Sequence, residues 1–97
     1  MLFAIYALDK SGSTDLRAAT RPTHLAYLDG FVSQLRLAGP MLNDAGQSIG
    51  SLLVIEAENQ AAAEALAAAD PYAQAGLFES VTIRPYRTVY KDGARLG

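Results

Sequence analysis

The stretch from Arg21 to Leu28 holds the side chains that are best suited to chemistry. His24 is the only histidine of the chain, and an imidazole, which ordinarily titrates at about pH 6.5, can accept or donate a proton at neutral pH. Arg21 carries a fork of N–H donors that can bind a carboxylate or a phenolate. The pair indicates a site that could bind a small anion and move a proton.

An amphipathic helix is expected to position both side chains. At 3.6 residues per turn, the apolar side of the stretch from Leu25 to Ala38 consists of Leu25, Leu28, Phe31, Val32, Leu35 and Ala38. His24 and Arg21 project from this same side, which predicts that they point toward the core or a cleft. Buried polar groups need partners, so the site should lie at this end of the helix.

Composition excludes several classes of protein. The 97 residues predict one domain, and 51% hydrophobic against 19% charged residues is typical of a globular chain. A net charge of −2 argues against a nucleic-acid partner. The absence of cysteine excludes disulfides and thiolate chemistry. No apolar run is long enough to span a membrane and no signal-peptide pattern opens the chain, so we expect no membrane partner and a cytoplasmic location.

Periodicity and breakers predict six elements. The first is a strand over 2–8. The second is a helix whose first segment spans 15–20, which kinks or restarts at Pro22 and runs to about Leu37. The other four are a short strand over 41–43, a strand over 49–57, a helix over 60–69, and a strand over 79–90. Gly39 and Pro40 are expected to stop the first helix. Residues 91–97 are expected to form a flexible, frayed tail.

The order β-α-β-β-α-β is that of the ferredoxin-like fold of the α+β class, a four-stranded antiparallel sheet with two helices on one face. The strands over 2–8 and 49–57 are apolar on both faces, as central strands should be, and the half-polar last strand suits an edge. The face without helices would expose apolar side chains. We therefore expect a homodimer through the open sheet face.

Several short motifs support a family resemblance. In chain order they are Arg21-Pro22-x-His24-Leu25-Ala26-Tyr27-Leu28, Ala38-Gly39-Pro40, Ile49-Gly50-Ser51-Leu52, Ala69-Asp70-Pro71-Tyr72 and Gly76-Leu77-Phe78. Together they resemble the YCII-related (YciI-like) family, so residues 1–90 are read as a single YCII-like domain. The resemblance implies a fold of the dimeric α+β barrel type. It also implies a His–Asp active-site pair at His24 and Asp70, and lyase-type chemistry on small, often aromatic, ring compounds.

Geometry sets a condition on that pair. The two helices of this topology run roughly parallel, so Asp70 at the end of the second helix lies far from the start of the first. A contact with His24 therefore requires His24 to sit well inside the first helix, with residues 14–20 preceding it. Without such a contact, Asp70 reads as a helix terminator before proline, and His24 as a core histidine bonded to a backbone carbonyl.

Three further residues are candidates for binding a ligand. Tyr6 and Tyr72 could line a pocket for a ring or donate a hydrogen bond, although tyrosines at such positions commonly serve core and interface packing. Ser51 could donate to a ligand from a central strand, although it also suits a strand start as a small residue.

The sequence favours a small cofactor-free enzyme that acts on a small anionic or aromatic molecule. In this hypothesis His24 transfers a proton, Asp70 orients it and Arg21 holds the substrate's charge, in an elimination or isomerisation. No P-loop, dinucleotide-binding motif or usual zinc-ligand set is present, so neither a cofactor nor a metal is expected. Two alternatives remain open: a non-catalytic ligand-binding or accessory domain, and a polar cluster that is purely structural.

Overall fold

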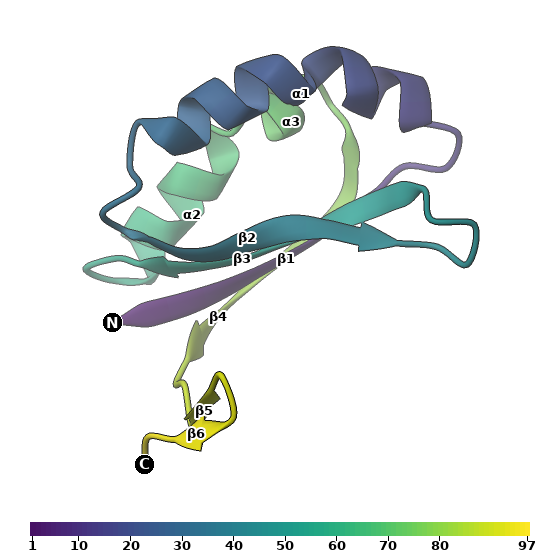
Figure 1. The fold of residues 1–97 in the computed structure, drawn as a ribbon. Coiled ribbons are helices and arrows are strands. Elements are labelled where there is room, and N and C mark those ends of the chain that lie inside the picture. The colour runs from purple at the N-terminus through teal and green to yellow at the C-terminus, as the bar shows by residue number, and fades with distance from the viewer.

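Four strands form one antiparallel sheet, and the helices cover one of its faces (Figure 1). The structure is a computed structural model that describes residues 1–97. In chain order the elements are β1 (Leu2–Asp9), α1 (Thr14–Asp29), β2 (Leu35–Leu42), β3 (Ser48–Glu56), α2 (Gln60–Ala68), α3 (Pro71–Gln74), β4 (Phe78–Tyr86), β5 (Tyr90–Lys91) and β6 (Ala94–Arg95). None of the helices combines the length and apolar character that a membrane span requires.

The strand order β2-β3-β1-β4 is that of a ferredoxin-like α+β fold, which confirms the prediction. β1 and β3 occupy the centre, and Ile5 of β1 pairs with Leu53 on one side and Ile83 on the other. These two strands had to be central because both of their faces are apolar, and an edge strand would leave such residues in water.

α1 is one unbroken helix although it contains Pro22, where a kink or a restart was expected. Pro22 is exposed, whereas Arg17 and His24 are buried on either side of it. Arg17 bonds to Asp9 and Ser51 of the sheet, and His24 contacts Asp70 at the start of α3. These contacts offset the backbone hydrogen bond that proline cannot donate. His24 therefore lies well inside a continuous helix, as a contact with Asp70 requires.

The predicted end of the first helix is wrong. α1 ends at Asp29, with Gly30 as its C-cap, and Leu35 already belongs to β2, which pairs with β3. Helical spacing could not distinguish the two structures because Leu35 packs against the core from the strand, just as it would from a helix.

β2 is therefore longer than the expected strand over 41–43, and Gly39 and Pro40 lie inside it rather than ending a helix. Pro40 is tolerated because β2 is an edge strand, where the missing N–H need not break a ladder. Ala38 and Pro40 pair with Leu53 and Ser51 of β3, and so share their face of the sheet. Their small side chains leave room beneath α1.

The core lies between the central strands and the helices. Its buried members are Phe3, Ile5, Leu28, Leu53, Ile55, Ala57 and Ala63. The alanine-rich α2 adds little bulk, and the side chain of Asn59 caps it by accepting a hydrogen bond from the Ala62 N–H. The segment after α2 contains the short helix α3.

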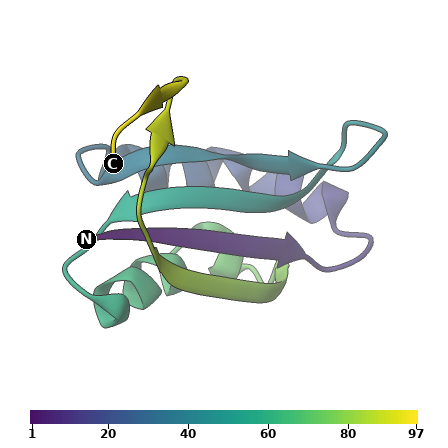
Figure 2. The same ribbon diagram turned by 90° about the horizontal axis from the view of Figure 1, so that it is seen from below.

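The opposite face of the sheet carries no helix (Figure 2). Its exposed large side chains include Tyr6, Leu37, Leu52 and Tyr86. The last residues cross below this face, and residues 90–95 form the hairpin β5–β6 where we expected a frayed tail. An Asp-Gly pair favours a tight hairpin turn, and the sequence has one at Asp92-Gly93.

Gly50 has no room for a side chain. A Cβ there would lie 2.5 Å from the Ala7 carbonyl oxygen and 2.6 Å from Met41 Cε. Gly50→Ala should lower the free energy of unfolding in urea by about 1–3 kcal/mol, the usual cost of overpacking.

Gly39→Ala, in the adjacent strand β2, is the matched control. Nothing lies within 4 Å of a Cβ at Gly39, so the free energy of unfolding should change by no more than about 0.5 kcal/mol. Equal losses in the two variants would contradict the packing described.

Candidate functional site

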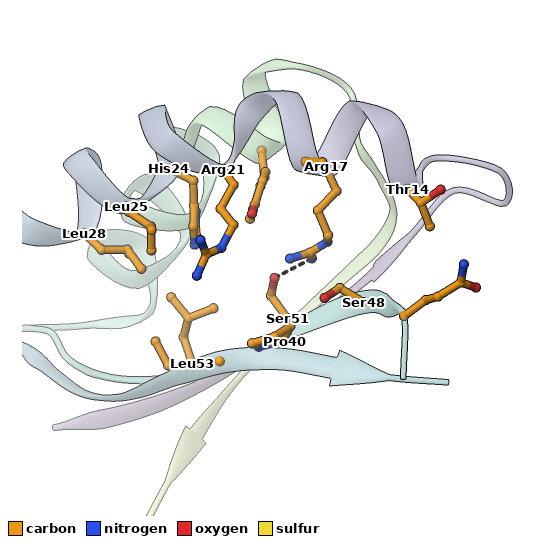
Figure 3. A pocket seen from close by; sticks show the side chains of 15 residues that line it. Thr14, Arg17, Arg21, His24, Leu25, Leu28, Pro40, Ser48, Ser51 and Leu53 are labelled. Carbon is orange, nitrogen blue, oxygen red and sulfur yellow. Dashed lines mark hydrogen bonds between the residues drawn. The ribbon is translucent and has the colours of Figure 1, made fainter. Parts of the chain in front are cut away.

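A pocket of about 420 Å³ opens between α1 and the strands β2 and β3 (Figure 3). α1 forms one wall, β2 and β3 form the floor, and Tyr72 of α3 contributes its ring. The pocket exists because one helix spans both strands while Ala38, Gly39 and Pro40 of β2 are small.

The wall on α1 is polar. Arg17, Arg21, His24 and Leu28 are spaced by four, three and four residues, which puts them on one face of the helix. In Figure 3, Arg17, Arg21 and His24 all extend from α1 toward the pocket. One helix face thus brings two guanidinium groups and an imidazole to the same space.

His24 is buried and contacts Asp70, with 2.8 Å between His24 Nδ1 and Asp70 Oδ1. The same oxygen accepts a hydrogen bond from the Tyr72 N–H at 2.9 Å and so caps α3. A carboxylate can only accept, so the contact requires the proton to sit on Nδ1. Nε2 is then the nitrogen left for a ligand in the pocket.

Arg17 is buried beside Asp9. Its Nε and Nη2 donate to the two carboxylate oxygens at 2.6 and 3.0 Å, and Nη2 also donates to Ser51 Oγ at 2.7 Å. Burial of the guanidinium opposes its charge, but the hydrogen bond and the charge of Asp9 outweigh burial, so the pKa of Arg17 is raised. The two-bond contact with Asp9 holds the Arg17 side chain in one position in this wall of the pocket.

Tyr72 connects the two clusters. Its ring stacks on the His24 imidazole with 3.9 Å between centroids, and Arg17 Cζ lies 4.4 Å from the centre of the same ring. Burial raises the pKa of the Tyr72 phenol, although the positive charges of Arg17 and Arg21 oppose the shift. Tyr72 therefore stays protonated at neutral pH and can donate a hydrogen bond.

Arg21 differs from Arg17 because it is exposed and has no ion pair or side-chain hydrogen bond within the chain. Its charge remains free to meet a ligand. The structure brings His24, Asp70, Arg21, Ser51 and Tyr72 to one region. It places Tyr6 on the opposite, open face of the sheet, away from this pocket, because Tyr6 alternates with the helix-facing Ile5 and Ala7.

Sequence reasoning missed Arg17 and its partner Asp9. The signal was present, because Arg17 precedes Arg21 by four residues and His24 by seven. It was overlooked because Pro22 was taken to separate residues 15–20 from the main helix. No group of three or more His, Cys, Asp or Glu side chains is close enough to hold a metal ion.

The fold and the site place the chain among ferredoxin-like proteins with a polar pocket beneath the first helix. The chain belongs to the YCII-related domain family, whose match covers residues 1–87. Protein YciI of Escherichia coli is 43% identical to it, over 93% of this chain and all of that protein.

Solved structures are also similar to this chain. The 5-chloro-2-hydroxyhydroquinone dehydrochlorinase of Burkholderia phenoliruptrix, solved in complex with 2,5-dihydroxybenzoquinone, is 33% identical with a TM-score of 0.84, over 90% of this chain and 94% of that one. An antibiotic biosynthesis monooxygenase at 10% identity has a TM-score of 0.52, over 91% of this chain and 100% of that one, and is similar in fold alone. The structural neighbours are of the dimeric α–β barrel type.

Arg17→Met should leave the buried Asp9 carboxylate without its cation. Removing one partner of a buried ion pair typically costs about 3–5 kcal/mol, and we expect a loss of this order in the free energy of unfolding, measured with urea. Arg36→Met is the control, since Arg36 is exposed and donates only to the Ser33 carbonyl. A loss at Arg17 no greater than at Arg36 would show that the pair does not support the fold.

Proposed function

We propose that this protein is a small enzyme that uses His24 to move a proton on a small, acidic ring compound. The reaction class is an elimination or an isomerisation that needs no cofactor. The pocket supplies a base and an unpaired cation, and Asp70 beside it supplies an orienting carboxylate; these are the groups that such a reaction needs.

The observation that supports the proposal most is the contact between His24 Nδ1 and Asp70 Oδ1 at the edge of a pocket. Asp70 would hold the imidazole in one tautomer and orientation, and would stabilise the imidazolium once the ring has taken a proton. Structural histidines also bond to carboxylates. In this chain, however, the second nitrogen has no protein partner and the ring lines a space large enough for a ligand.

In an elimination, one ring hydroxyl would first become a carbonyl as its proton moves to the ring carbon that bears the leaving group, such as chloride. His24 Nε2 would then take the proton of a second ring hydroxyl. The electron pair of that O–H bond would form a second carbonyl, shift the adjacent ring double bond toward the chlorinated carbon, and expel chloride with its bonding pair. The ring would lose one proton and one chloride ion in total, with no change in electron count that needs an oxidant. The imidazolium would then release its proton to water.

Arg21 would stabilise the charge that develops during this step. It is the guanidinium in the pocket without a carboxylate partner, so a phenolate or enolate oxygen can bind it without competition. The protonated Tyr72 hydroxyl and Ser51 could donate further hydrogen bonds. Tyr6, on the opposite face, is left out of this proposal.

The relatedness of the dehydrochlorinase adds support for the substrate class. That protein acts on a chlorinated, hydroxylated ring and binds a dihydroxyquinone, and a pocket of about 420 Å³ can hold a single six-membered ring with its substituents. We propose that this chain takes a planar ring with acidic hydroxyl groups.

We also propose that the protein works as a homodimer through the open sheet face. Tyr6, Leu37, Leu52 and Tyr86 are exposed on that face, and sheet-to-sheet packing would remove them from water. Two copies joined in this way would keep both pockets accessible, because each pocket lies on the helix side of its sheet.

His24→Gln provides the functional test. With 5-chloro-2-hydroxyhydroquinone as substrate, chloride release by the wild type should fall by at least about a hundredfold in His24→Gln, because general-base catalysis is lost. Binding of 2,5-dihydroxybenzoquinone, measured by calorimetry, should change by less than about tenfold, since only one hydrogen bond is lost. Asp70→Asn should reduce turnover in the same direction.

Asp29→Asn is the matched control, because it neutralises an exposed carboxylate of α1 away from the pocket. Turnover by His24→Gln at the wild-type rate would rule out the catalytic role. A wild type that binds the quinone tightly but releases no chloride would instead favour the non-catalytic ligand-binding alternative for this compound class.

A further inference from the structure

Residues 87–97, which we call the arm, leave the sheet after β4 and fold into the hairpin β5–β6. Asp92 and Gly93 form its two-residue turn with φ values of 51° and 78°, the positive pair that a tight hairpin of matching twist requires. The Leu96 N–H donates to the Val89 carbonyl at 2.6 Å and closes its base. The arm is thus an ordered element with its own turn chemistry.

The arm does not bury its apolar side chains in its own chain. Tyr90 and Leu96 are 61% and 60% exposed, and Val89 is 43% exposed. No side-chain hydrogen bond or ion pair joins the arm to the body of the protein. A lone two-stranded hairpin is marginally stable in water, so we expect another surface to cover these side chains.

The position of the arm indicates where that surface lies. Figure 1 shows β5 and β6 standing off below the sheet, on the side opposite the helices. Figure 2 shows the chain leaving the β4 edge and passing across the open face toward β2. Anything that packs against the open face of this chain therefore meets the arm as well.

Charge points to a second copy as the occupant. The arm contains three of the eight basic residues, Arg87, Lys91 and Arg95, and one of the ten acidic residues, Asp92, for a net charge of +2. The whole chain has a net charge of −2, which leaves −4 on residues 1–86. A basic arm therefore complements the acidic body of another copy, and two-fold symmetry would use the same contact twice.

We propose that the arm is a clasp that one copy lays on the other. In the homodimer, Val89, Tyr90 and Leu96 of each copy pack against the body of the partner beside its open sheet face. The basic side chains of the arm then face a partner body of net negative charge. The inference rests on the proposed homodimer and adds to it a segment that sheet-to-sheet packing alone would leave exposed.

Sedimentation velocity on the full chain tests the clasp. The wild type should be a dimer, and the double variant Tyr90→Ser/Leu96→Ser should raise its dissociation constant by at least about tenfold, as loss of aromatic and apolar anchors does at interfaces. Val32→Ser is the matched control, because Val32 is 63% exposed and lies away from the arm, in the loop after α1. Its dissociation constant should equal that of the wild type.

A mixed dimer of one isotope-labelled and one unlabelled copy gives the second readout. Nuclear Overhauser contacts from Tyr90 of one copy to the body of the other should appear. A monomeric wild type would overturn both the homodimer and the clasp. The clasp would be overturned if the double variant left the dimer dissociation constant unchanged, or if Tyr90 contacted only its own chain. Either result would leave the proposed sheet interface unaffected.

Discussion

The carboxylate of Asp70 is the interaction on which the site depends. One of its oxygens meets His24 Nδ1 at 2.8 Å and the Tyr72 N–H at 2.9 Å. The first contact ties α1 to the end of α2, and the second starts α3 and so places the Tyr72 ring against the imidazole. A single buried acceptor therefore fixes the position, the tautomer and the stacking partner of the only histidine.

Some polar groups of the site are buried and bonded within the protein, whereas others are left available to a ligand. Arg17 donates to Asp9 and Ser51 through Nε and Nη2, and no buried side-chain nitrogen or oxygen lacks a hydrogen-bond partner. The wall of the pocket is thus preorganised by bonds that a ligand does not have to replace. Arg21 and the second nitrogen of His24 are left over, and they are the groups to which we assign binding and proton transfer.

The sequence predicted the sheet better than it predicted the ends of the elements. The two doubly apolar strands identified the centre of the sheet because apolar residues on both faces require cover on both faces. The end of α1 could not be predicted, because Leu35 satisfies the spacing of a helix and packs on the core from a strand. Pro40, taken as a helix stop, is accommodated by an edge strand, and edge position is a tertiary property.

The site, too, could be predicted only in part from the sequence. The family motif and the helical wheel were enough to single out His24, Asp70 and Arg21. His24 and Arg21 line one pocket, and Asp70 contacts His24. Arg17 was missed because Pro22 was given more weight than the four- and three-residue spacing that crosses it. Tyr6 was chosen for its residue type, but a single strand pattern does not tell which face of a doubly apolar strand will carry the helices.

The tautomer of His24 tests the central claim most directly. Long-range proton–nitrogen NMR of the single imidazole, at a pH where it is neutral, reports which nitrogen carries the proton. We predict a protonated Nδ1 and an unprotonated Nε2 in the wild type, and loss of this preference in Asp70→Asn. A wild-type ring protonated on Nε2, or a ring unchanged by Asp70→Asn, would contradict the account, because Asp70 would then not prepare His24 to act as a base.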